Sequence, residues 1–325
     1  MKKKLLTLLM SALLVLTACS GGNVPEGKED GKQIKIGIVQ LIEHKALDQA
    51  RLGFEESLKT EGLNVSIDYK SAQGEITNAR TIVEKFVKDQ VDLIFAIATP
   101  AAQAAQAVAP KDMPIIFSAV TDAVSAGLVE SNEAPAANLT GTSDKVELKG
   151  QLSLFKEIDP SIQKIGFIYS ADEDNSVVQL KEVENFAAEL ALEVVPQSIQ
   201  NLSDLPQAAQ SIVNRIDGLY IPSDNKVASS ITLLTDVMNE HKIVTVGAED
   251  AHVAGGALIS KGISYFQLGQ QAGQMAVKIL RDGKNPSEIP VETANEISKI
   301  VNLQTLEDLG LNKESDVFSN AKALE

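Results

Sequence analysis

The sequence predicts an α/β protein made of two doubly wound lobes, each a parallel sheet with helices on both faces. From residue 34 onward, short apolar runs alternate with amphipathic helical stretches. Connections of only a few residues between such elements favour parallel strands. The alternation runs twice, on either side of residues 119–163, and 325 residues are enough for two lobes of ordinary size.

The first series of elements covers residues 34–118. Apolar residues recur on one face of the stretch 46–60, at Leu47, Ala50, Phe54 and Leu58, as in an amphipathic helix. Buried strands are expected where short runs of Ile, Val, Leu and Phe occur. The expected strands are 34–39, 65–69, 91–97 and 114–118, and the expected helices are 46–60, 78–88 and 101–108.

The second series begins after residue 163 and has the same rhythm. Its expected strands are 164–169, 192–198, 218–222 and 243–246, and its expected helices are 176–190, 205–213 and 228–241. A long helix over 265–281 follows, in which Gly269 and Gly273 are four residues apart and share one face, a pattern typical of close helix packing. A last strand is expected over 297–303. The repetition predicts two lobes of the same architecture.

The first 32 residues have the composition of a secretion signal followed by a tether. Lys2–Lys4 precede an apolar run, Leu5–Leu16, which is too short to span a hydrocarbon core of about 30 Å. The run ends in Leu-Thr-Ala-Cys19, which resembles a bacterial lipobox, and Cys19 is the only cysteine of the chain. This resemblance implies a lipoprotein signal peptide over 1–18, lipidation of Cys19 and a flexible tether over 19–32.

The composition excludes several classes of function. The formal net charge is −15, and loss of residues 1–18, which carry three lysines and no acids, makes it −18. Because so acidic a chain is repelled by phosphate backbones, no nucleic-acid partner is expected. His44, His241 and His252 lie too far apart in sequence for a metal-ligand spacing, and the one cysteine is assigned to the anchor. We therefore expect neither a metal nor another cofactor.

Polar side chains gather where the expected strands end. Ligands of open parallel sheets bind beyond the carboxyl ends of the strands. Gln40 and Thr99 follow strands of the first series, and Ser170 and Asp224 follow strands of the second. Each of these residue types is also a common helix cap, and the acidic run 172–176 is interpreted as a helix start rather than a calcium loop. Their recurrence at one edge of both lobes favours a ligand cleft.

The strand ends offer binding groups without an activated nucleophile. The sequence has no Gly-x-Ser-x-Gly elbow, and no Gly-x-Gly-x-x-Gly fingerprint follows the first strand. This favours a carrier over an enzyme. A lipid-anchored surface hydrolase is the alternative from another class, and it would require turnover.

The lipobox, the tether and the two lobes together resemble the substrate-binding lipoproteins of ABC importers. The resemblance implies a fold like that of type I periplasmic binding proteins, with a three-segment hinge between the lobes. Several motifs resemble those of the tryptophan/tyrosine-type (aromatic amino acid) binding family. These motifs lie at residues 36–48, 51–54, 98–103, 117–122, 138–144 and 222–225. Lys45 stands where the family usually has proline, which loosens the backbone there.

The resemblance implies a free amino acid as ligand, aromatic and with tryptophan favoured, held between the lobes. Its carboxylate would meet Thr99 with the helix amides behind it, together with nearby hydroxyls. Its ammonium group would meet Asp144, Asp224 or Glu249. The expected ligand-binding residues are Gln40, His44, Thr99, Pro100, Ala101, Ser118, Thr121, Asp122, Ser143, Asp144, Ser170, Asp224, Asn225, Glu249 and Val253.

The same resemblance implies how such a protein works. The lobes close over the ligand, and the closed form docks on ABC permease subunits that work with a cytoplasmic ATPase. The expected N-terminal lobe is 33–142 plus 256–288, and the C-terminal lobe is 143–255 plus 289–325, with hinge strands near 142–146, 253–257 and 286–292. The protein is expected at the extracytoplasmic face of the cell membrane, held by its lipid anchor. A sugar or nucleoside binder of the same fold and a ligand sensor domain are the alternatives.

Overall fold

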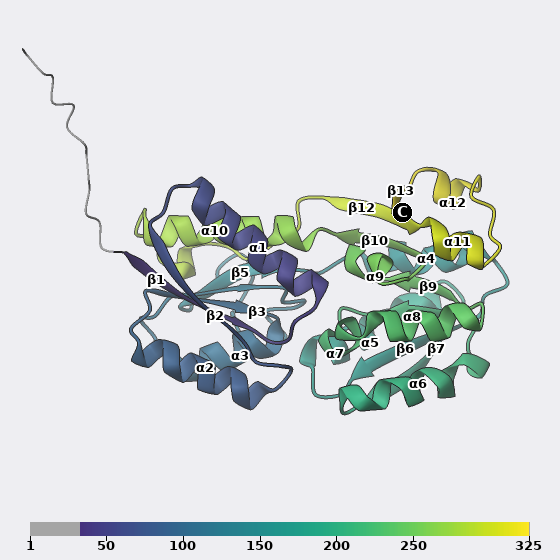
Figure 1. Ribbon diagram of the computed structural model, residues 1–325, viewed down its shortest axis with the longest axis horizontal. Coiled ribbons are helices and arrows are strands. Elements are labelled where there is room, and N and C mark those ends of the chain that lie inside the picture. The colour runs from purple at the N-terminus through teal and green to yellow at the C-terminus, as the bar shows by residue number, and fades with distance from the viewer. Residues whose placement is uncertain (1–32, 325) are drawn as a thin grey trace, which may run out of the picture. The chain divides into compact units, whose positions relative to one another are not determined.

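The chain forms two β-sheets flanked by helices (Figure 1). The computed structural model describes residues 33–324. The expected signal peptide, Cys19 and the tether lie outside these residues. Among the helices of the described range, none is long and apolar enough to cross a membrane.

Within residues 33–324, the first sheet has six strands, all parallel, in the order β11-β5-β4-β3-β1-β2. Its strands are β1 (Ile34–Gln40), β2 (Val65–Ser71), β3 (Leu93–Ile97), β4 (Ile115–Ser118), β5 (Leu139–Ser143) and β11 (Glu292–Thr293). The helices packed on it are α1 (Lys45–Thr60), α2 (Ile76–Lys88), α3 (Thr99–Val108) and α10 (Tyr265–Leu280). The strands β3, β4 and β5 are buried along their whole length, because helices cover both faces of the sheet.

The second sheet has seven strands in the described part of the chain, in the order β13-β12-β10-β9-β8-β6-β7. Strand β12 runs antiparallel to β10, and the other neighbours are parallel. The strands are β6 (Lys164–Ser170), β7 (Glu193–Ile199), β8 (Gly218–Ile221), β9 (Val244–Gly247), β10 (Ile259–Ile263), β12 (Ile297–Asn302) and β13 (Lys322–Leu324). The helices are α4 (Leu148–Ile158), α5 (Asp174–Glu189), α6 (Leu205–Ile212), α7 (Asn225–Ser229), α8 (Ile231–Glu240), α9 (Asp250–Ala254), α11 (Leu303–Asp308) and α12 (Asp316–Ser319).

The two sheets are wound alike. The order β2-β1-β3-β4-β5 in the first sheet matches β7-β6-β8-β9-β10 in the second. This confirms the predicted fold class, an α/β protein of two doubly wound parallel-sheet lobes. The helix expected over 228–241 is divided into α7 and α8, because Ser230 has φ −128° and ψ 33° and so leaves the helical region.

Three segments connect the sheets. The chain crosses first between β5 and α4, returns at Ser264 between β10 and α10, and crosses again at residues 294–296 between β11 and β12. We expected residues 256–263 in the first lobe, but β10 lies in the second sheet between β9 and β12. The second and third crossings therefore lie later along the chain than the expected 253–257 and 286–292.

Helices α1 and α10 pack closely, and their backbones approach through glycines (Figure 1). A Cβ added at Gly53 would lie 2.0 Å from the carbonyl oxygen of Phe266, and one at Gly269 would lie 1.9 Å from that of Ala50. The expected packing role of Gly269 is confirmed. Because α10 follows the crossing at Ser264 directly, this packing fixes the position of Tyr265 at the junction between the lobes.

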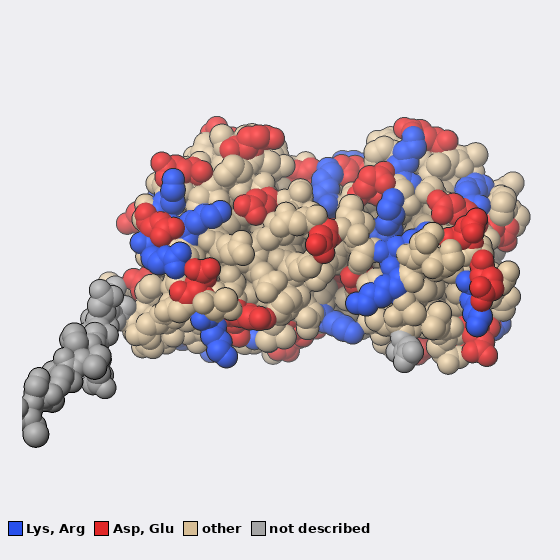
Figure 2. Space-filling model, turned by 90° about the horizontal axis from the view of Figure 1, so that it is seen from above, with Lys and Arg blue, Asp and Glu red and all other residues tan. Residues whose placement is uncertain are grey.

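Acidic and basic side chains are interspersed over the face shown in Figure 2. The described residues also form surface ion pairs, such as Lys85 with Asp68 at 3.0 Å and Arg281 with Glu61 at 3.0 Å. Exposed pairs of this kind each contribute only about 0–1 kcal/mol to stability. The fold is therefore held mainly by its buried apolar core and by the hydrogen bonds of its sheets.

Candidate functional site

Two contacts join the lobes at the strand ends. His44 precedes α1 just after β1, and its Nε2 lies 3.4 Å from Oδ1 of Asn225, which begins α7 just after β8. Nε2 of Gln103 on α3 donates to Oδ2 of Asp174 on α5 at 2.8 Å. The carboxyl edges of the two sheets thus face each other, which is where ligands of such sheets bind.

Five buried amide or carboxyl oxygens of side chains at these strand ends have no hydrogen-bond donor within residues 33–324. We call them the open acceptors, and they are Gln40 Oε1, Asp144 Oδ1, Glu173 Oε1, Asn175 Oδ1 and Glu249 Oε1. A buried polar atom left without a partner costs about 1–3 kcal/mol, and native proteins keep few of them. Their concentration at one edge indicates a site for a ligand that donates hydrogen bonds.

A hinge cluster is formed by Asp144, Tyr265 and Glu249. The phenol of Tyr265 donates to Asp144 Oδ2 at 2.6 Å and also lies within hydrogen-bonding range of Glu249. Burial raises the pKa of Glu249 to about 8, and burial also raises the pKa of Asp144 against its hydrogen bonds. A cation beside the two open acceptors of this cluster would stabilise the ionised form of both carboxyl groups and lower their pKa values.

His252 lies between the hinge cluster and His44. Its Nε2 is 3.2 Å from Glu249 Oε1, although the geometry is not that of a hydrogen bond. Burial lowers the pKa of His252 to about 3, with a smaller contribution from His44. Because Glu249 is also protonated at pH 7, the contact joins two neutral groups and is not an ion pair. His44 is neutral as well, because burial lowers its pKa to about 4.

A second cluster lies at the start of α5 and contains Glu173, Asn175 and Asn225. The backbone N–H and Nδ2 of Asn225 donate to Glu173 Oε2 at 3.2 and 2.5 Å, and Asn175 Nδ2 donates to the same oxygen at 3.3 Å. Burial, followed by repulsion from Asp224, raises the pKa of Glu173 to about 8. The sequence predicts only a helix start at this acidic run, whereas the structure also gathers these side chains into a buried cluster. The signal available in the sequence was an acid and an amide two residues apart, Glu173 and Asn175, shortly after an expected strand.

Asp224, an expected ammonium ligand, has both carboxylate oxygens engaged by the protein. Oδ2 accepts from Ser170 N at 2.6 Å and Ser176 Oγ at 2.7 Å, and Oδ1 accepts from Ser170 Oγ and Val227 N, both at 2.9 Å. Four donors fill the positions that a carboxylate offers. Asp224 therefore caps α7 and holds the loops after β6 and β8 together.

The first lobe supplies Gln40, Thr99 and Ser118 at the ends of β1, β3 and β4. Nε2 of Gln40 donates to Ile42 O and to Asp48 Oδ1, both at 2.9 Å, which fixes the amide orientation and leaves Oε1 as an acceptor. Thr99 is the first residue of α3, and no residue of 33–324 bonds its buried Oγ1. Ser118 Oγ accepts from Thr142 Oγ1 at 2.9 Å.

The other expected residues have structural partners or are apolar. Ser143 Oγ donates to the carbonyl oxygen of Thr121 at 3.0 Å. Asp122 is half-buried, accepts from Ser125 N at 2.9 Å and lies 3.7 Å from Lys145 Nζ. The remaining three are buried in the first turns of α3 and in α9, and they are Pro100, Ala101 and Val253.

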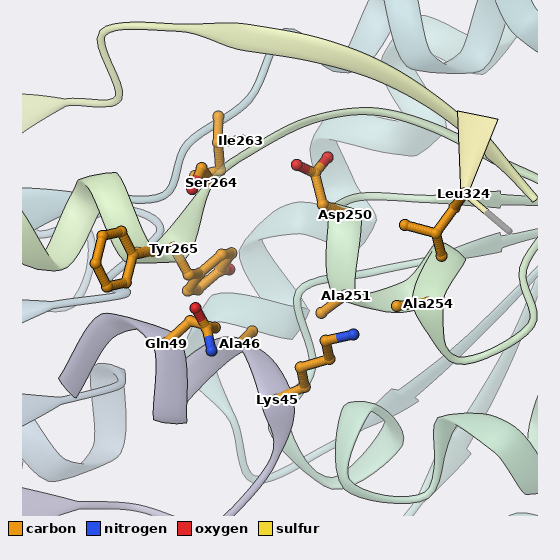
Figure 3. A pocket seen from close by; sticks show the side chains of 11 residues that line it. Lys45, Ala46, Gln49, Asp250, Ala251, Ala254, Ile263, Ser264, Tyr265 and Leu324 are labelled. Atoms are coloured by element: carbon orange, nitrogen blue, oxygen red, sulfur yellow. The ribbon is translucent and has the colours of Figure 1, made fainter. Parts of the chain in front are cut away.

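Two pockets with walls from both lobes flank α9. One, of about 230 Å³, is lined by His44, Glu249 and His252 among others. The second, of about 280 Å³, lies beside Tyr265, with Lys45 of α1 and Asp250 of α9 on its walls (Figure 3). Burial raises the pKa of Asp250 to about 6. Because both lobes contribute walls, the shape of each pocket depends on how the lobes are closed.

Within residues 33–324, no group of three or more His, Cys, Asp and Glu side chains is placed to hold a metal ion.

Comparison with known proteins assigns the chain to a family. Residues 35–324 match the family model of ABC transporter substrate binding proteins. The chain belongs to this family. Such proteins are extracytoplasmic binding subunits that work with membrane permeases and are not enzymes, which confirms the expectation of a carrier.

Relatives of this substrate-binding protein match over nearly its full length. A tyrosine-binding protein of Clostridioides difficile (strain R20291) is 41% identical over 324 residues, which cover 96% of this chain and 93% of that protein. A solved ABC domain from Streptococcus pneumonia in complex with L-Trp is 30% identical with a TM-score of 0.84, and the match covers 89% of this chain and 100% of that one. These similarities confirm the resemblance to aromatic amino acid binders.

A third relative differs in its arrangement. It is the ligand-free, open structure of a substrate binding protein with adhesive properties from Clostridium difficile, and it is 41% identical, covering 90% of this chain and 99% of its own. Its TM-score is only 0.68, below that of the less similar complex with L-Trp. A rotation between two rigid lobes lowers a TM-score in this way, and the contacts across the cleft described above are those of a closed form.

Proposed function

We propose that this substrate-binding protein captures a free aromatic amino acid between its lobes and delivers it to permease subunits that work with a cytoplasmic ATPase. The observation that carries the proposal is the pair of open acceptors at Asp144 and Glu249, on either side of Tyr265. An ammonium group brings three N–H donors and a positive charge. Both are missing around the carboxyl groups of Asp144 and Glu249, which are buried and have raised pKa values. The tyrosine-binding relative and the complex with L-Trp support an aromatic side chain.

The other end of the amino acid is assigned to the first lobe. The ten-residue helix α3 begins at Thr99, where free backbone N–H groups and the helix dipole favour an anion. The unengaged Oγ1 of Thr99 adds a further donor. We assign the ligand carboxylate to this helix start, and we assign the side chain to the space between Gln40, His44 and Val253.

Closure and release follow from the three crossings between the sheets. We propose that the lobes rotate about residues 144–147, 264 and 294–296, because there the chain passes from one sheet to the other. Opening would break the contacts His44–Asn225 and Gln103–Asp174. It would also expose the open acceptors to water, which satisfies them while the site is empty.

We also propose that a lipid on Cys19 holds the protein at the extracytoplasmic face of the cell membrane. The lipobox-like Leu-Thr-Ala-Cys and the glycine-rich residues that follow support this anchor. A tether raises the effective concentration of the protein near its permease. Cys19→Ala should move the protein from the membrane fraction to the soluble fraction in an immunoblot and leave ligand affinity unchanged.

A thermal-shift screen tests the ligand class. The mature chain is heated with each of the twenty amino acids, with sugars and with nucleosides. A ligand at 100 times its Kd stabilises the protein by about 2.7 kcal/mol, a shift that is easily measured. We expect shifts with aromatic amino acids, whereas a shift with a sugar alone would contradict the proposal.

Variants of the hinge cluster test the ammonium assignment. Asp144→Asn and Glu249→Gln should weaken binding of every amino acid ligand, as measured by calorimetry, because the ammonium is common to all. Glu61→Gln is the matched control, since Glu61 pairs with Arg281 at the surface of the first lobe. Unchanged affinity in both cluster variants would place the ammonium elsewhere.

A further inference from the structure

The loop that carries Glu249 begins where two strands of the second sheet separate. The pairing of β9 with β10 ends at Gly247 and Ser260. From there, β9 continues into Glu249, and β10 continues through the second crossing to Tyr265. The separation of the two strands therefore sets how far Glu249 lies from Tyr265, its partner in the hinge cluster.

One buried amide bridges the two strands at this point. Nε2 of Gln151 donates to the carbonyl oxygen of Ala248 at 2.9 Å and to that of Lys261 on β10 at 2.8 Å. Ala248 is the residue before Glu249, and the side chain of Gln151 is fully buried. Because a buried carbonyl group that loses its donor is costly, the amide holds the strands at a fixed separation.

A phenol fixes the orientation of this amide. Tyr220 on β8 donates its O–H to Oε1 of Gln151 at 2.6 Å. Burial raises the pKa of the Tyr220 phenol well above its ordinary value, so the phenol stays protonated and donates. Since backbone carbonyl groups only accept, Nε2 must face them and Oε1 must face the phenol. The amide therefore cannot turn without breaking three hydrogen bonds.

The loop before Glu249 also packs tightly on β10. A Cβ added at Gly262 would lie 2.8 Å from the carbonyl oxygen of Ala248 and 2.9 Å from Cα of Glu249. The carbonyl group that Gln151 binds is thus held between the amide and the backbone of β10. A shift of either strand would move Glu249 directly.

Gln151 lies between the first two crossings of the chain. It is in the first turn of α4, which follows the first crossing and Asp144. Its partner Lys261 lies on β10, which leads into the second crossing and Tyr265. The members of the hinge cluster therefore lie on chain segments that meet at Gln151.

We propose that Gln151 is a positioning residue for the ammonium site, because its amide sets where Glu249 lies relative to Tyr265. The inference rests on the proposed function, since it takes Glu249 as a ligand of the ammonium group. Gln151 acts through Glu249 and not on the ligand itself.

Recognition of an ammonium group by two carboxyl groups depends on their spacing. Charge-assisted hydrogen bonds have lengths of about 2.7–2.9 Å, so a small displacement of the Glu249 loop removes one of them. Under the proposed function, the first lobe holds the ligand carboxylate and those contacts remain. Loss of the Gln151 amide should therefore weaken recognition of the ammonium group and not binding of the whole ligand.

Calorimetric titration of the mature chain with matched ligands tests the inference. L-Tyrosine and L-tryptophan are each compared with their des-amino analogue, which has the same ring and carboxylate but no ammonium group. The wild type should bind each amino acid at least about tenfold more tightly than its analogue. In Gln151→Met, which keeps the side-chain length without a donor, affinity for the amino acids should fall about tenfold and that for the analogues less than about threefold.

Gln271→Met is the matched control. Gln271 is also buried, and its Nε2 also donates twice, to Glu292 Oε2 and to the carbonyl oxygen of Thr293, both at 3.1 Å. These contacts lie within the first lobe. The control should lower the melting temperature of the ligand-free protein, as Gln151→Met does, and leave the affinity ratio between each amino acid and its analogue unchanged.

Tyr220→Phe is a second variant at the site. It keeps the ring and removes only the O–H that orients the amide, so the same ratio should fall about two- to tenfold. Thermal unfolding without ligand verifies that each variant is folded. If Gln151→Met is not folded, Tyr220→Phe decides the test.

An unchanged ratio in Gln151→Met and Tyr220→Phe would overturn the inference and leave the proposed function standing, even if all affinities fell together. An equally reduced ratio in Gln271→Met would do the same, because the effect would then not depend on the Glu249 loop. Failure of the wild type to bind any amino acid would instead overturn the proposed function. Equal binding of amino acids and analogues by the wild type would overturn the ammonium assignment, and this inference with it.

Discussion

The phenol of Tyr265 donates to Oδ2 of Asp144 at 2.6 Å, and this hydrogen bond ties two of the three crossings between the lobes to each other. Asp144 follows β5 directly, and Tyr265 is the first residue after the crossing at Ser264. The same pair borders the proposed ammonium site. This one hydrogen bond therefore depends both on the charge of the ligand and on the geometry of the hinge.

Tyr265→Phe should weaken both binding and folding. The change leaves Asp144 Oδ2 buried without its donor, at a cost of about 1–3 kcal/mol. We expect amino acid affinity to fall about tenfold by calorimetry, with a lower melting temperature. Tyr69→Phe is the control, because its hydroxyl donates to Glu43 at the surface at 3.3 Å. Equal effects of the two variants would contradict a special role for the buried pair.

Gln103→Ala should lower ligand affinity although Gln103 lies outside the proposed binding set. The variant loses the 2.8 Å hydrogen bond to Asp174 across the cleft, so a smaller fraction of the protein is closed. One hydrogen bond contributes about 0.5–1.5 kcal/mol, which corresponds to about 2- to 12-fold in Kd. Gln106→Ala on the same helix is the control, since its amide bonds Gly127 O and Leu128 O within the first lobe. A matching loss in the control would refute the interpretation as a closure contact.

The stability of the ligand-free closed form should fall as pH rises. Burial raises the pKa of Glu249 and of Glu173 from 4.5 to about 8. Because the folded pKa is the higher one, the contribution of each group is complete below pH 4.5 and is lost progressively up to about pH 8. Melting temperatures measured from pH 5 to 8 should decline, and less steeply in Glu249→Gln. Identical slopes in the variant and the wild type would show that Glu249 ionises normally.

An amino acid ligand should flatten this pH dependence. Its ammonium group favours the ionised form of Glu249, so binding below pH 8 releases a proton and affinity rises with pH. Calorimetry in two buffers of different ionisation enthalpy measures the proton released. No proton release at pH 7 would contradict the assignment of the ammonium to this carboxyl group.

Gly269→Ala should destabilise the first lobe. A methyl group there would lie 1.9 Å from the carbonyl oxygen of Ala50, so α1 and α10 must separate, at a cost of about 1–3 kcal/mol. Gly150→Ala is the control, because its Cβ would meet only the side-chain ends of Glu147 and Lys261. Urea unfolding of both variants measures the difference. A loss in the control as large as that in Gly269→Ala would argue against helix separation as the cause.

The sequence predicted most of the fold, because buried parallel strands require apolar runs and the helices between them require one apolar face. It did not predict β10. The strand Ile259–Ile263 contains Ser, Lys and Gly, and it forms because β9 and β12 pair with it on either side. Such pairing joins residues far apart in the chain and leaves no local periodicity. The second crossing was misplaced for the same reason.

The candidate site was predicted in part. Asp144 and Glu249 follow strands, so their place at the carboxyl edge was visible in the sequence. Whether an acid there is free or engaged depends on donors from other loops, which no local pattern reveals. The carboxylate of Asp224 accepts hydrogen bonds from Ser170 and Ser176, whereas Glu173 keeps an open acceptor. Tyr265 follows the misplaced crossing, so it could not be assigned to the site.

The return of α10 and β11 to the first sheet has a consequence for biosynthesis. The lobe that the ribosome begins first needs residues up to Thr293 before α1 has its helical neighbour and β5 its outer strand. Until those residues emerge, the face of α1 that carries Ala50 and Gly53 stays uncovered, whereas Phe54 already stacks on Phe95 of β3. The first lobe therefore reaches its final packing only late in synthesis, after most of the second sheet has been made.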